Sequence, residues 1–190
     1  MRDQFIKNSS ASTKALEPAC KLIERQIPQE MSDKIAEITV NPRTRDVTAI
    51  GFSQNSLKFK CQRCAVFCCK CGGPRLSLKD IENLRRSGKC LDLLVDVEDM
   101  TLKNAKDGSC YLLAVDSHQQ KYECSVYNLR PTLCRLYPFR FERLGEHSFE
   151  LKLIPCCNGL NVHDGEPVDE HFFSKYLLHP FLDLLNHDHI

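Results

Sequence analysis

The 190-residue sequence lacks several features that commonly assign a protein to a class. It has no run of about 18 consecutive apolar residues, which argues against a transmembrane helix. Its start, MRDQFIKNSSASTKALEP, lacks the apolar core of a signal peptide. The 26 basic and 25 acidic residues leave a net charge of +1, so charge gives no argument for nucleic acid or an acidic membrane as a partner. We therefore expect a cytoplasmic protein with no nucleic-acid or membrane partner.

Cysteine, by contrast, is abundant, with 12 residues in the chain. The stretch FKCQRCAVFCCKCGG, from Phe59 to Gly73, is the densest in cysteine. Cytosolic reductants keep thiols unpaired, so a cytoplasmic chain with this many cysteines is expected to use them for metal binding or redox chemistry. A disulfide knot is the alternative interpretation, and it would need the export signal that the N-terminus lacks.

The first 57 residues differ from the rest, because they hold one cysteine, Cys20, and begin with a polar stretch. Apolar residues at helical spacing predict a helix over residues 14–26, which Pro28 ends. The stretches AEITV and DVTAIGF, on either side of NPRTR, predict two short strands joined by a turn. We treat residues 1–57 as an N-terminal extension that packs on a main domain formed by residues 58–190.

The main domain is predicted to consist of short helices and hairpins. Ser77 and Asp80 form a capping-box pattern at the start of a helix in LSLKDIENLRRSGK. CYLLAV and KYECSV predict a strand pair, and YNLRPTLCRLYPF predicts a turn or one short helix. Alternating apolar residues in PFRFERL and SFELKLIP predict a hairpin with one buried face. This hairpin would return Cys156 and Cys157 toward Cys134.

The last stretch, VDEHFFSKYLLHPFLDLLNHDHI, has apolar residues at helical spacing and predicts a helix that Pro180 interrupts. Together these elements predict an α+β fold. We expect a small, irregular, metal-stabilised domain with short strands, hairpins and a few helices.

The spacing of the thiols supports a metal site. In Cys61-x-x-Cys64, two intervening residues allow both sulfurs to face one ion. Cys68 and Cys69 add two more thiols, although adjacent cysteines are expected to direct their sulfurs apart. Thiolates are soft ligands that select zinc, copper(I) or iron–sulfur clusters over magnesium or calcium. None of the seven histidines lies at zinc-finger spacing from a cysteine pair.

From Phe59 to about residue 160 the chain resembles a known family. The motifs that carry the resemblance are the dense cysteine stretch, LSLKDIENL, GSCYLL, CSVYNLRPTLCRLYPF and a later CC. They are similar to the YkgJ-like cysteine-cluster family, the CxxCxxCC proteins described as zinc- or iron-chelating domains. The family signature C-x-[IV]-Y-x-x-R-P-x-x-C-R-x-x-P-F is matched by Cys124, Val126, Tyr127, Arg130, Pro131, Cys134, Arg135, Pro138 and Phe139. The resemblance implies eight metal ligands: Cys61, Cys64, Cys68, Cys69, Cys110, Cys124, Cys134 and Cys156.

At two places the sequence departs from the family pattern, and there two alternative cysteines could each be the ligand. Residues 65–67 make the spacing CxxCxxxCC, one residue longer than in the family. The family's double cysteine therefore corresponds either to Cys68 and Cys69 or to Cys69 and Cys71. The late cysteine, which the family usually follows with Pro-Gly, is here part of CCNG at residues 156–159, so either cysteine of that pair can be the ligand.

The resemblance implies a zinc ion or an iron–sulfur cluster as the cofactor. A four-cysteine zinc site would hold a loop-rich domain together. A [4Fe–4S] cluster uses the same number of thiolates and would serve a redox or accessory role together with a protein partner. The surplus of cysteines over the needs of one zinc ion favours the cluster.

Two arginines near Cys134 are the expected cofactor-binding cations. Arg130 and Arg135 would lower the pKa of nearby thiols and offset the negative charge of a cluster. Their alternative role is to pair with backbone carbonyls or with an acid such as Asp80. Tyr127 is expected to pack in the core with its hydroxyl satisfied.

A second hypothesis is enzymatic. Relatives of the family are described as flagellin lysine N-methylases, which would make this chain a protein methyltransferase. The sequence has no glycine-rich Rossmann loop to hold S-adenosylmethionine, and no CxxxCxxC motif of the radical enzymes that use it. The enzyme hypothesis therefore rests on resemblance alone, and no catalytic residue is assigned.

Overall fold

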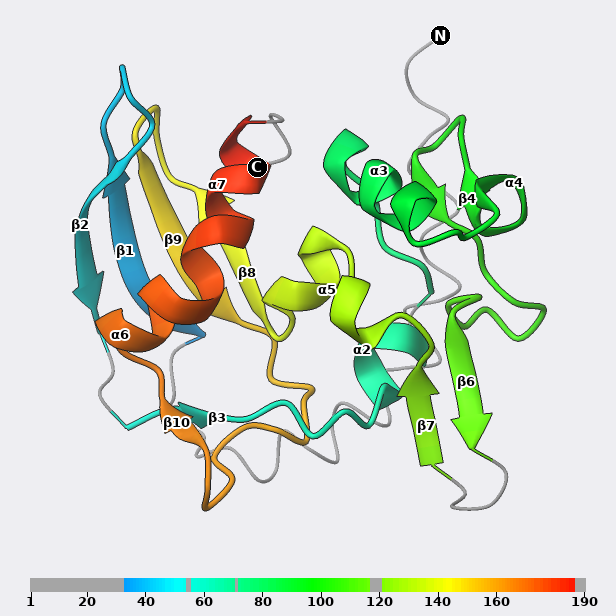
Figure 1. Ribbon diagram of the computed structural model, residues 1–190. Helices are drawn as coiled ribbons and strands as arrows, with labels where there is room; N and C mark the ends of the chain where they lie inside the picture. Colours follow the sequence, from blue (N-terminus) through cyan, green and yellow to red (C-terminus); the bar gives the residue numbers. More distant parts are fainter. Residues whose placement is uncertain (1–32, 54–55, 71, 117–120, 187–190) are drawn as a thin grey trace, which may run out of the picture.

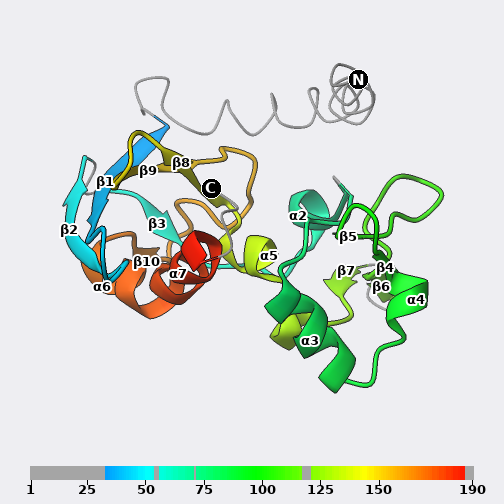
Figure 2. The same ribbon diagram turned by 90° about the horizontal axis from the view of Figure 1, so that it is seen from above.

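The computed structural model describes residues 33–53, 56–70, 72–116 and 121–186 (Figure 1). Its elements fall into two parts, which lie side by side in Figure 2. One part is a four-stranded antiparallel sheet of order β2-β1-β9-β8 with helices on one face, and the other consists of short helices and two-stranded ribbons. The mixture of helices and strands in a small fold agrees with the predicted α+β class, while its stabilisation by metal stays a prediction.

The sheet joins strands from distant parts of the sequence. β1 (Lys34–Val40) pairs with β2 (Val47–Phe52) and with β9 (Ser148–Leu153), and β8 (Phe139–Arg143) pairs with β9. Both predicted hairpins are confirmed. The Asn41 side chain accepts backbone amides in the turn between β1 and β2, as asparagine commonly does in turns. The predicted extension, residues 1–57, thus supplies two strands to the same sheet as β8 and β9.

The β8–β9 hairpin buries one face, as its alternation predicts. Phe139 and Phe141 of β8 and Phe149 and Leu151 of β9 are all buried. Phe181 packs on this face, with its ring centroid 4.4 Å from that of Phe141. Burying such a side chain contributes about 1.5–3 kcal/mol. The aromatic contacts therefore fix the C-terminal helix on the sheet, where Figure 1 shows it.

Pro180 does not interrupt the C-terminal helix, contrary to the prediction. α6 (Glu170–Phe172), the π-helical segment η2 (Phe173–Leu177) and α7 (Leu178–Asn186) follow one another without a break. Pro180 lies in the first turn of α7. Because proline has no amide to donate to the preceding turn, a widened π segment just before it removes the conflict.

The second part surrounds a separate core. Its elements are α2 (Val66–Lys70), α3 (Leu78–Arg86), α4 (Leu91–Leu94), β4 (Val95–Asp96), β5 (Thr101–Leu102), β6 (Leu113–Asp116) and β7 (Lys121–Cys124). The capping box of Ser77 and Asp80 is present at the start of α3, and β6 pairs with β7, so both predictions are confirmed. Leu76 and Leu84 are buried beside Cys69 and Cys110.

Two stretches of chain join the two parts. β3 (Lys58–Phe59) pairs with β10 (Glu166–Pro167), and the chain then runs from the sheet into the cysteine stretch. The 3-10 turn η1 (Tyr127–Leu129) and α5 (Thr132–Leu136) lead back from β7 to β8. The first stretch carries Cys61 and Cys64, and α5 in the second carries Cys134.

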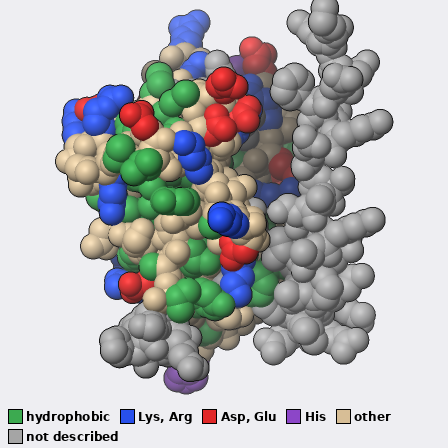
Figure 3. Space-filling view, turned by 90° about the vertical axis from the view of Figure 1, so that its right-hand side faces the viewer, with side chains coloured by type: hydrophobic (Ala, Val, Ile, Leu, Met, Phe, Trp, Pro, Cys, Tyr) green, Lys and Arg blue, Asp and Glu red, His purple; other side chains and the backbone are tan. Residues whose placement is uncertain are grey.

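The remaining expectations concern the N-terminus and the surface. The helix predicted over residues 14–26 lies outside the described residues. Within the described ranges, no helix has the length and apolar character to cross a bilayer. Figure 3 shows the side that carries α4 and β6, where basic and acidic side chains are interspersed, in keeping with the balanced charge.

Candidate metal centre

The late double cysteine is held beside the CxxC loop by backbone hydrogen bonds. The Lys60 amide donates to the Gly159 carbonyl (3.0 Å), and the Asn161 amide donates to the Lys58 carbonyl (2.8 Å). Gly159 permits this approach, since a Cβ atom there would lie 2.3 Å from the Lys60 carbonyl oxygen. Two segments far apart in sequence are thereby brought together. The double cysteine thus lies beside the CxxC loop, while its predicted proximity to Cys134 stays a prediction.

Around Cys64 the backbone turns sharply. Arg63 (φ 54°) and Ala65 (φ 49°) adopt the left-handed conformation that side chains other than glycine rarely take. The chain then enters α2, which carries Cys68 and Cys69. Ala65 is also buried, and it is one of the three residues between Cys64 and Cys68 that make the spacing CxxCxxxCC. Such conformations persist where the surrounding structure holds them, and they cluster at functional sites.

Five cysteines from three segments form what we call the inner thiol group: Cys68, Cys69, Cys110, Cys124 and Cys134. Cys69 is hydrogen-bonded to Cys68, Cys110 and Cys124. Its Sγ atom lies 4.0 Å from that of Cys68. The expectation that these adjacent cysteines direct their sulfurs apart is therefore wrong, because α2 turns both side chains toward the same space. The Cys110 amide donates to the Cys69 carbonyl (2.7 Å), which holds the two segments together.

Protons are shared unequally within the inner thiol group. The single Cys69 proton, shared between its neighbours, lowers the pKa of Cys110 to about 7 and the pKa of Cys124 to about 6. The same contacts raise the pKa of Cys69, so this thiol keeps its proton while its neighbours become thiolates. Burial, and then the charge of the other cysteines, raises the pKa of Cys134. A metal ion would replace the shared protons and supply the positive charge that crowded thiolates need.

Cys61, Cys64 and Cys157 form the outer thiol group. Burial, together with the charges of Cys64, Cys61 and Cys68, raises the pKa of Cys157 to about 12. The charge of Cys68 also raises the pKa of Cys134, after burial. Because Cys68 is electrostatically close to both groups, the outer and inner thiol groups are neighbours within one region.

Arg130 and Tyr127 lie next to these thiols. An Arg130 nitrogen, Nη1, lies 3.8 Å from the Cys61 Sγ atom, and Arg130 Nε donates to the Tyr127 carbonyl (3.1 Å). After the hydrogen bond from Cys69, the charge of Arg130 helps to lower the pKa of Cys124. The Tyr127 hydroxyl is hydrogen-bonded to Cys61, and the half-buried ring lines a cavity instead of packing in the core. Arg130 thus lies at the thiols, and its contact with a cofactor stays a prediction.

Arg135 is directed elsewhere. Its Nη2 atom donates to Thr132 Oγ1 (3.1 Å) and lies 3.4 Å from Asp183 Oδ2. Asp80 accepts hydrogen bonds from the Thr132 amide (2.9 Å) and hydroxyl (3.1 Å), so it is not the partner of either arginine. The suggested pairing with Asp80 is wrong, because Thr132 and the helix cap occupy its oxygens. No thiol contact of Arg135 occurs among the described residues, and its cofactor role stays a prediction.

The donor set fits a soft metal in its chemistry. In the described ranges, no three Cys, His, Asp or Glu side chains already surround one point as ligands do. All members of both groups are nevertheless thiols, which zinc and iron–sulfur clusters prefer. Two sulfurs on one zinc ion are about 3.8 Å apart, given Zn–S bonds of about 2.3 Å in a tetrahedron, close to the 4.0 Å between Cys68 and Cys69. A cavity of about 30 Å³ touches five of the thiols: Cys61, Cys68, Cys69, Cys124 and Cys134.

Comparison with known families identifies the stretch that carries these thiols. The sequence profile of the CxxCxxCC family, described as "Putative zinc- or iron-chelating domain", matches residues 60–162, more than half of the chain. The chain belongs to this family. The matched stretch contains every member of the inner and outer thiol groups, so the resemblance seen in the sequence is confirmed.

A similar protein with no described function was also found. The uncharacterized protein MJ0661 of Methanocaldococcus jannaschii is 28% identical over 138 residues, covering 67% of this chain and 72% of that protein. No solved structure matches the chain. The CxxCxxCC family assignment therefore supports zinc or iron chelation at the level of the family.

The eight cysteines implied by the CxxCxxCC family differ in their placement. Seven of them belong to the two thiol groups: Cys61, Cys64, Cys68, Cys69, Cys110, Cys124 and Cys134. Cys156 is buried and disulfide-bonded, so its role as a thiolate ligand requires reduction of that bond and stays a prediction. Cys157 is free and joins the outer group, whereas Cys90 is free and exposed. Cys71 lies outside the described residues.

Arg63 is the residue at this centre that sequence reasoning missed. Its guanidinium carbon lies 4.3 Å from the centroid of the Tyr127 ring. The available signal was its position between the cysteines of Cys61-x-x-Cys64. That signal does not reveal the left-handed backbone that accompanies its contact with Tyr127.

Titration of the reduced, metal-free protein tests the proton sharing around Cys69. Ultraviolet thiolate absorption is expected to rise between about pH 6 and 7, because Cys124 and Cys110 titrate there, below the ordinary thiol value of 9.0. A Cys69→Ala variant removes the hydrogen bonds and should shift this rise to higher pH, whereas Cys90→Ala should not. A wild-type rise confined to pH 9 and above would contradict the arrangement.

Proposed function

We propose that the protein holds an iron–sulfur cluster of the [4Fe–4S] type through the inner thiol group and serves a redox or accessory role. The observation that carries the proposal is the convergence of five cysteines from three segments around Cys69. Four thiolates hold such a cluster, and nearby charge and burial set its reduction potential. Arg130, beside Cys61 and near Cys124, supplies a positive charge of the kind that offsets a thiolate cluster.

A structural zinc ion is the second candidate, and the size of the cavity favours it. The space among the thiols is about 30 Å³. A cavity of about 10–15 Å³ holds one water molecule, so this space suits a single ion as it stands. A cluster would require the thiols to move apart. Zinc would take four thiolates in a closed site and would contribute directly to folding.

Metal analysis of anaerobically purified, reduced protein separates these candidates. For a [4Fe–4S] cluster we expect about four iron atoms and about four sulfide ions per chain, with broad visible absorption that fades on reduction. A colourless protein with stoichiometric zinc would replace the cluster by the second candidate. A protein without stoichiometric iron or zinc would overturn both.

The methyltransferase hypothesis makes a different prediction. A lysine methylase of this kind has to bind S-adenosylmethionine, which calorimetry on the metal-loaded protein measures. No contact in the described residues favours this hypothesis over metal binding alone. Absence of binding would therefore leave the metal-centre proposal intact and remove the enzyme hypothesis.

A further inference from the structure

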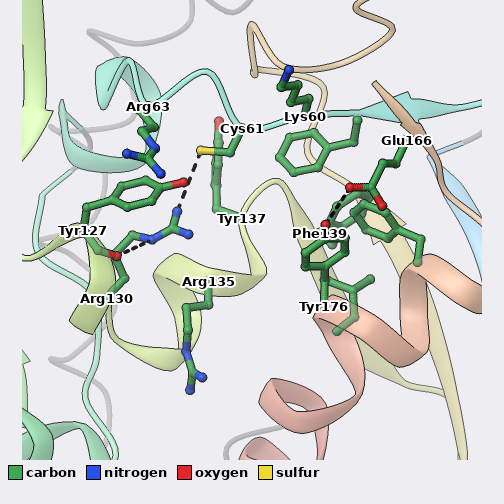
Figure 4. A pocket seen from close by; sticks show the side chains of 13 residues that line it. Lys60, Cys61, Arg63, Tyr127, Arg130, Arg135, Tyr137, Phe139, Glu166 and Tyr176 are labelled. Carbon is green, nitrogen blue, oxygen red and sulfur yellow. Dashed lines mark hydrogen bonds between the residues drawn. The ribbon is translucent and has the colours of Figure 1, made fainter. Parts of the chain in front are cut away.

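A cavity of about 350 Å³ adjoins the outer thiol group (Figure 4). Its volume lies at the lower end of small-molecule sites, which span about 300–1,000 Å³. On one side are Cys61, Arg63, Tyr127 and Arg130, and across the space stand Glu166 and Tyr176. The remaining lining is largely aromatic, so the cavity combines a cationic end with a flat apolar wall.

The cationic end contains two guanidinium groups around one ring. The guanidinium carbons of Arg63 and Arg130 lie 4.3 and 4.0 Å from the centroid of the Tyr127 ring. Figure 4 shows the ring between the two arginines. Within the described part of the chain, neither guanidinium has a carboxylate oxygen within 4.0 Å. Cation–π contacts hold the two groups in place without cancelling their charge.

Other cations at the same cavity are neutralised. Lys60 forms an ion pair with Asp164, and Arg135 pairs with Asp183 at 3.4 Å. These pairs make the lack of a carboxylate at Arg63 and Arg130 informative, because the other two cations at the cavity each have an acidic partner.

Cys61 can offset the positive charge of one of the two arginines. Arg130 Nη1 lies 3.8 Å from Cys61 Sγ, so a thiolate or a metal-bound sulfur at Cys61 would offset the charge of Arg130. Arg63 has no such contact with a thiol among the described residues, and it remains exposed at the rim of the cavity. The positive charge of Arg63 is therefore available to a ligand.

The apolar wall is formed by aromatic rings in mutual edge contact. Ring centroids of Phe59, Phe139 and Phe172 lie 5.3 to 6.0 Å apart. Such a wall stacks a flat apolar group well and gives little to a small inorganic ion. At its far end, Glu166 accepts from the Tyr176 hydroxyl (2.6 Å) and from Lys175 Nζ (3.0 Å), so this end offers no unpaired cation to a second negative charge on a ligand.

We propose that this cavity binds a small organic monoanion with a flat apolar body, its carboxylate at Arg63 and Arg130 and its body against the aromatic wall. A guanidinium fork matches a carboxylate in geometry as well as charge. The inference concerns a ligand site next to the metal centre and does not depend on which metal the thiols bind.

Benzoate is the probe, since it has one carboxylate on a flat ring. Calorimetric or NMR titration of the full chain is expected to show saturable binding that weakens as salt rises. Benzyl alcohol, which lacks the charge, and inorganic phosphate, which lacks the ring, should each bind at least about tenfold more weakly. Equal binding of either probe and benzoate would overturn the proposal.

Arginine variants test where the carboxylate of the ligand binds. Arg63→Gln should weaken benzoate binding at least about tenfold, because a charged hydrogen bond is lost. Arg86→Gln, which changes an exposed arginine paired with Glu82 on α3, is the matched control and should leave binding unchanged. Unchanged binding in Arg63→Gln would overturn the assignment. Metal content measured on the same samples keeps this outcome separate from that of the metal-centre proposal.

Discussion

A Cys124→Ser variant is expected to lose its bound metal and much of its stability together. Cys124 lies next to Cys69 in the inner thiol group, and its lowered pKa, about 6, makes it the readiest thiolate there. Mutation of groups that merely support metal ligands costs about 10–100-fold in affinity. Loss of a ligand should cost at least about 100-fold, which corresponds to about 2.7 kcal/mol of folding free energy. Metal analysis and denaturant unfolding of anaerobic samples measure the two effects.

Cys90→Ser is the matched control for this variant. It makes the same chemical change at a cysteine that is free but exposed, at the start of α4 and outside both thiol groups. Its metal content and unfolding midpoint should equal those of the wild type. Full metal retention by Cys124→Ser, or equal loss in both variants, would show that the inner thiol group is not the metal centre.

Local patterns in this sequence predict local structure well. Phe139 and Phe141 alternate with charged residues, and the strand they predict is β8. Ser77 and Asp80, three residues apart, predict a capping box that the structure contains at the start of α3. In each case the interacting residues are neighbours in sequence, so the physical cause is contained in the pattern itself.

Contacts between distant segments escape such reasoning. Arg135 is paired with Asp183, 48 residues later, and Arg63 lies over Tyr127, 64 residues later. Nothing in the sequence near either arginine indicates its partner. Pro180 shows a different limit, because a helix breaker is accommodated where a π-helical segment precedes it. The rule that proline ends a helix fails here because the preceding turn widens.

The metal centre depends both on local sequence patterns and on contacts between distant segments. Family resemblance predicts the set of cysteines. Their division into inner and outer groups depends on three crossings, by which we mean contacts between segments that are far apart in the sequence. The Cys110 amide bonded to the Cys69 carbonyl fixes one crossing, and Gly159 packed on the Lys60 carbonyl fixes another. The third crossing joins α3 to α5 through the hydrogen bonds of a single buried carboxylate.

That carboxylate is Asp80, and replacing it by alanine is expected to destabilise the protein by about 2–4 kcal/mol. Asp80 is 3% exposed. Its Oδ2 accepts the Ser77 amide (3.0 Å), and its Oδ1 accepts the amide and hydroxyl of Thr132. Loss of a helix cap costs about 1 kcal/mol, and leaving the buried donors of Thr132 unpaired costs about 1–3 kcal/mol more.

The effect should extend to the metal centre, because Asp80 links a helix of one core to a helix of the other. Leu84 of α3 belongs to one core and Leu136 of α5 to the other, and α5 carries Cys134. Asp80→Ala should therefore lower the midpoint of denaturant unfolding and speed the release of metal to a chelator. Asp92→Ala, at an exposed position on α4, provides the control and should change neither.

Asp80→Asn refines the test. An asparagine oxygen can still accept from Thr132, but the amide nitrogen cannot accept from the Ser77 amide. The loss of stability should therefore be smaller than in Asp80→Ala, about 1 kcal/mol if the cap alone is affected. If asparagine and alanine destabilise equally, the contacts to Thr132 contribute little, and the third crossing must be held by the apolar contacts around α5 instead.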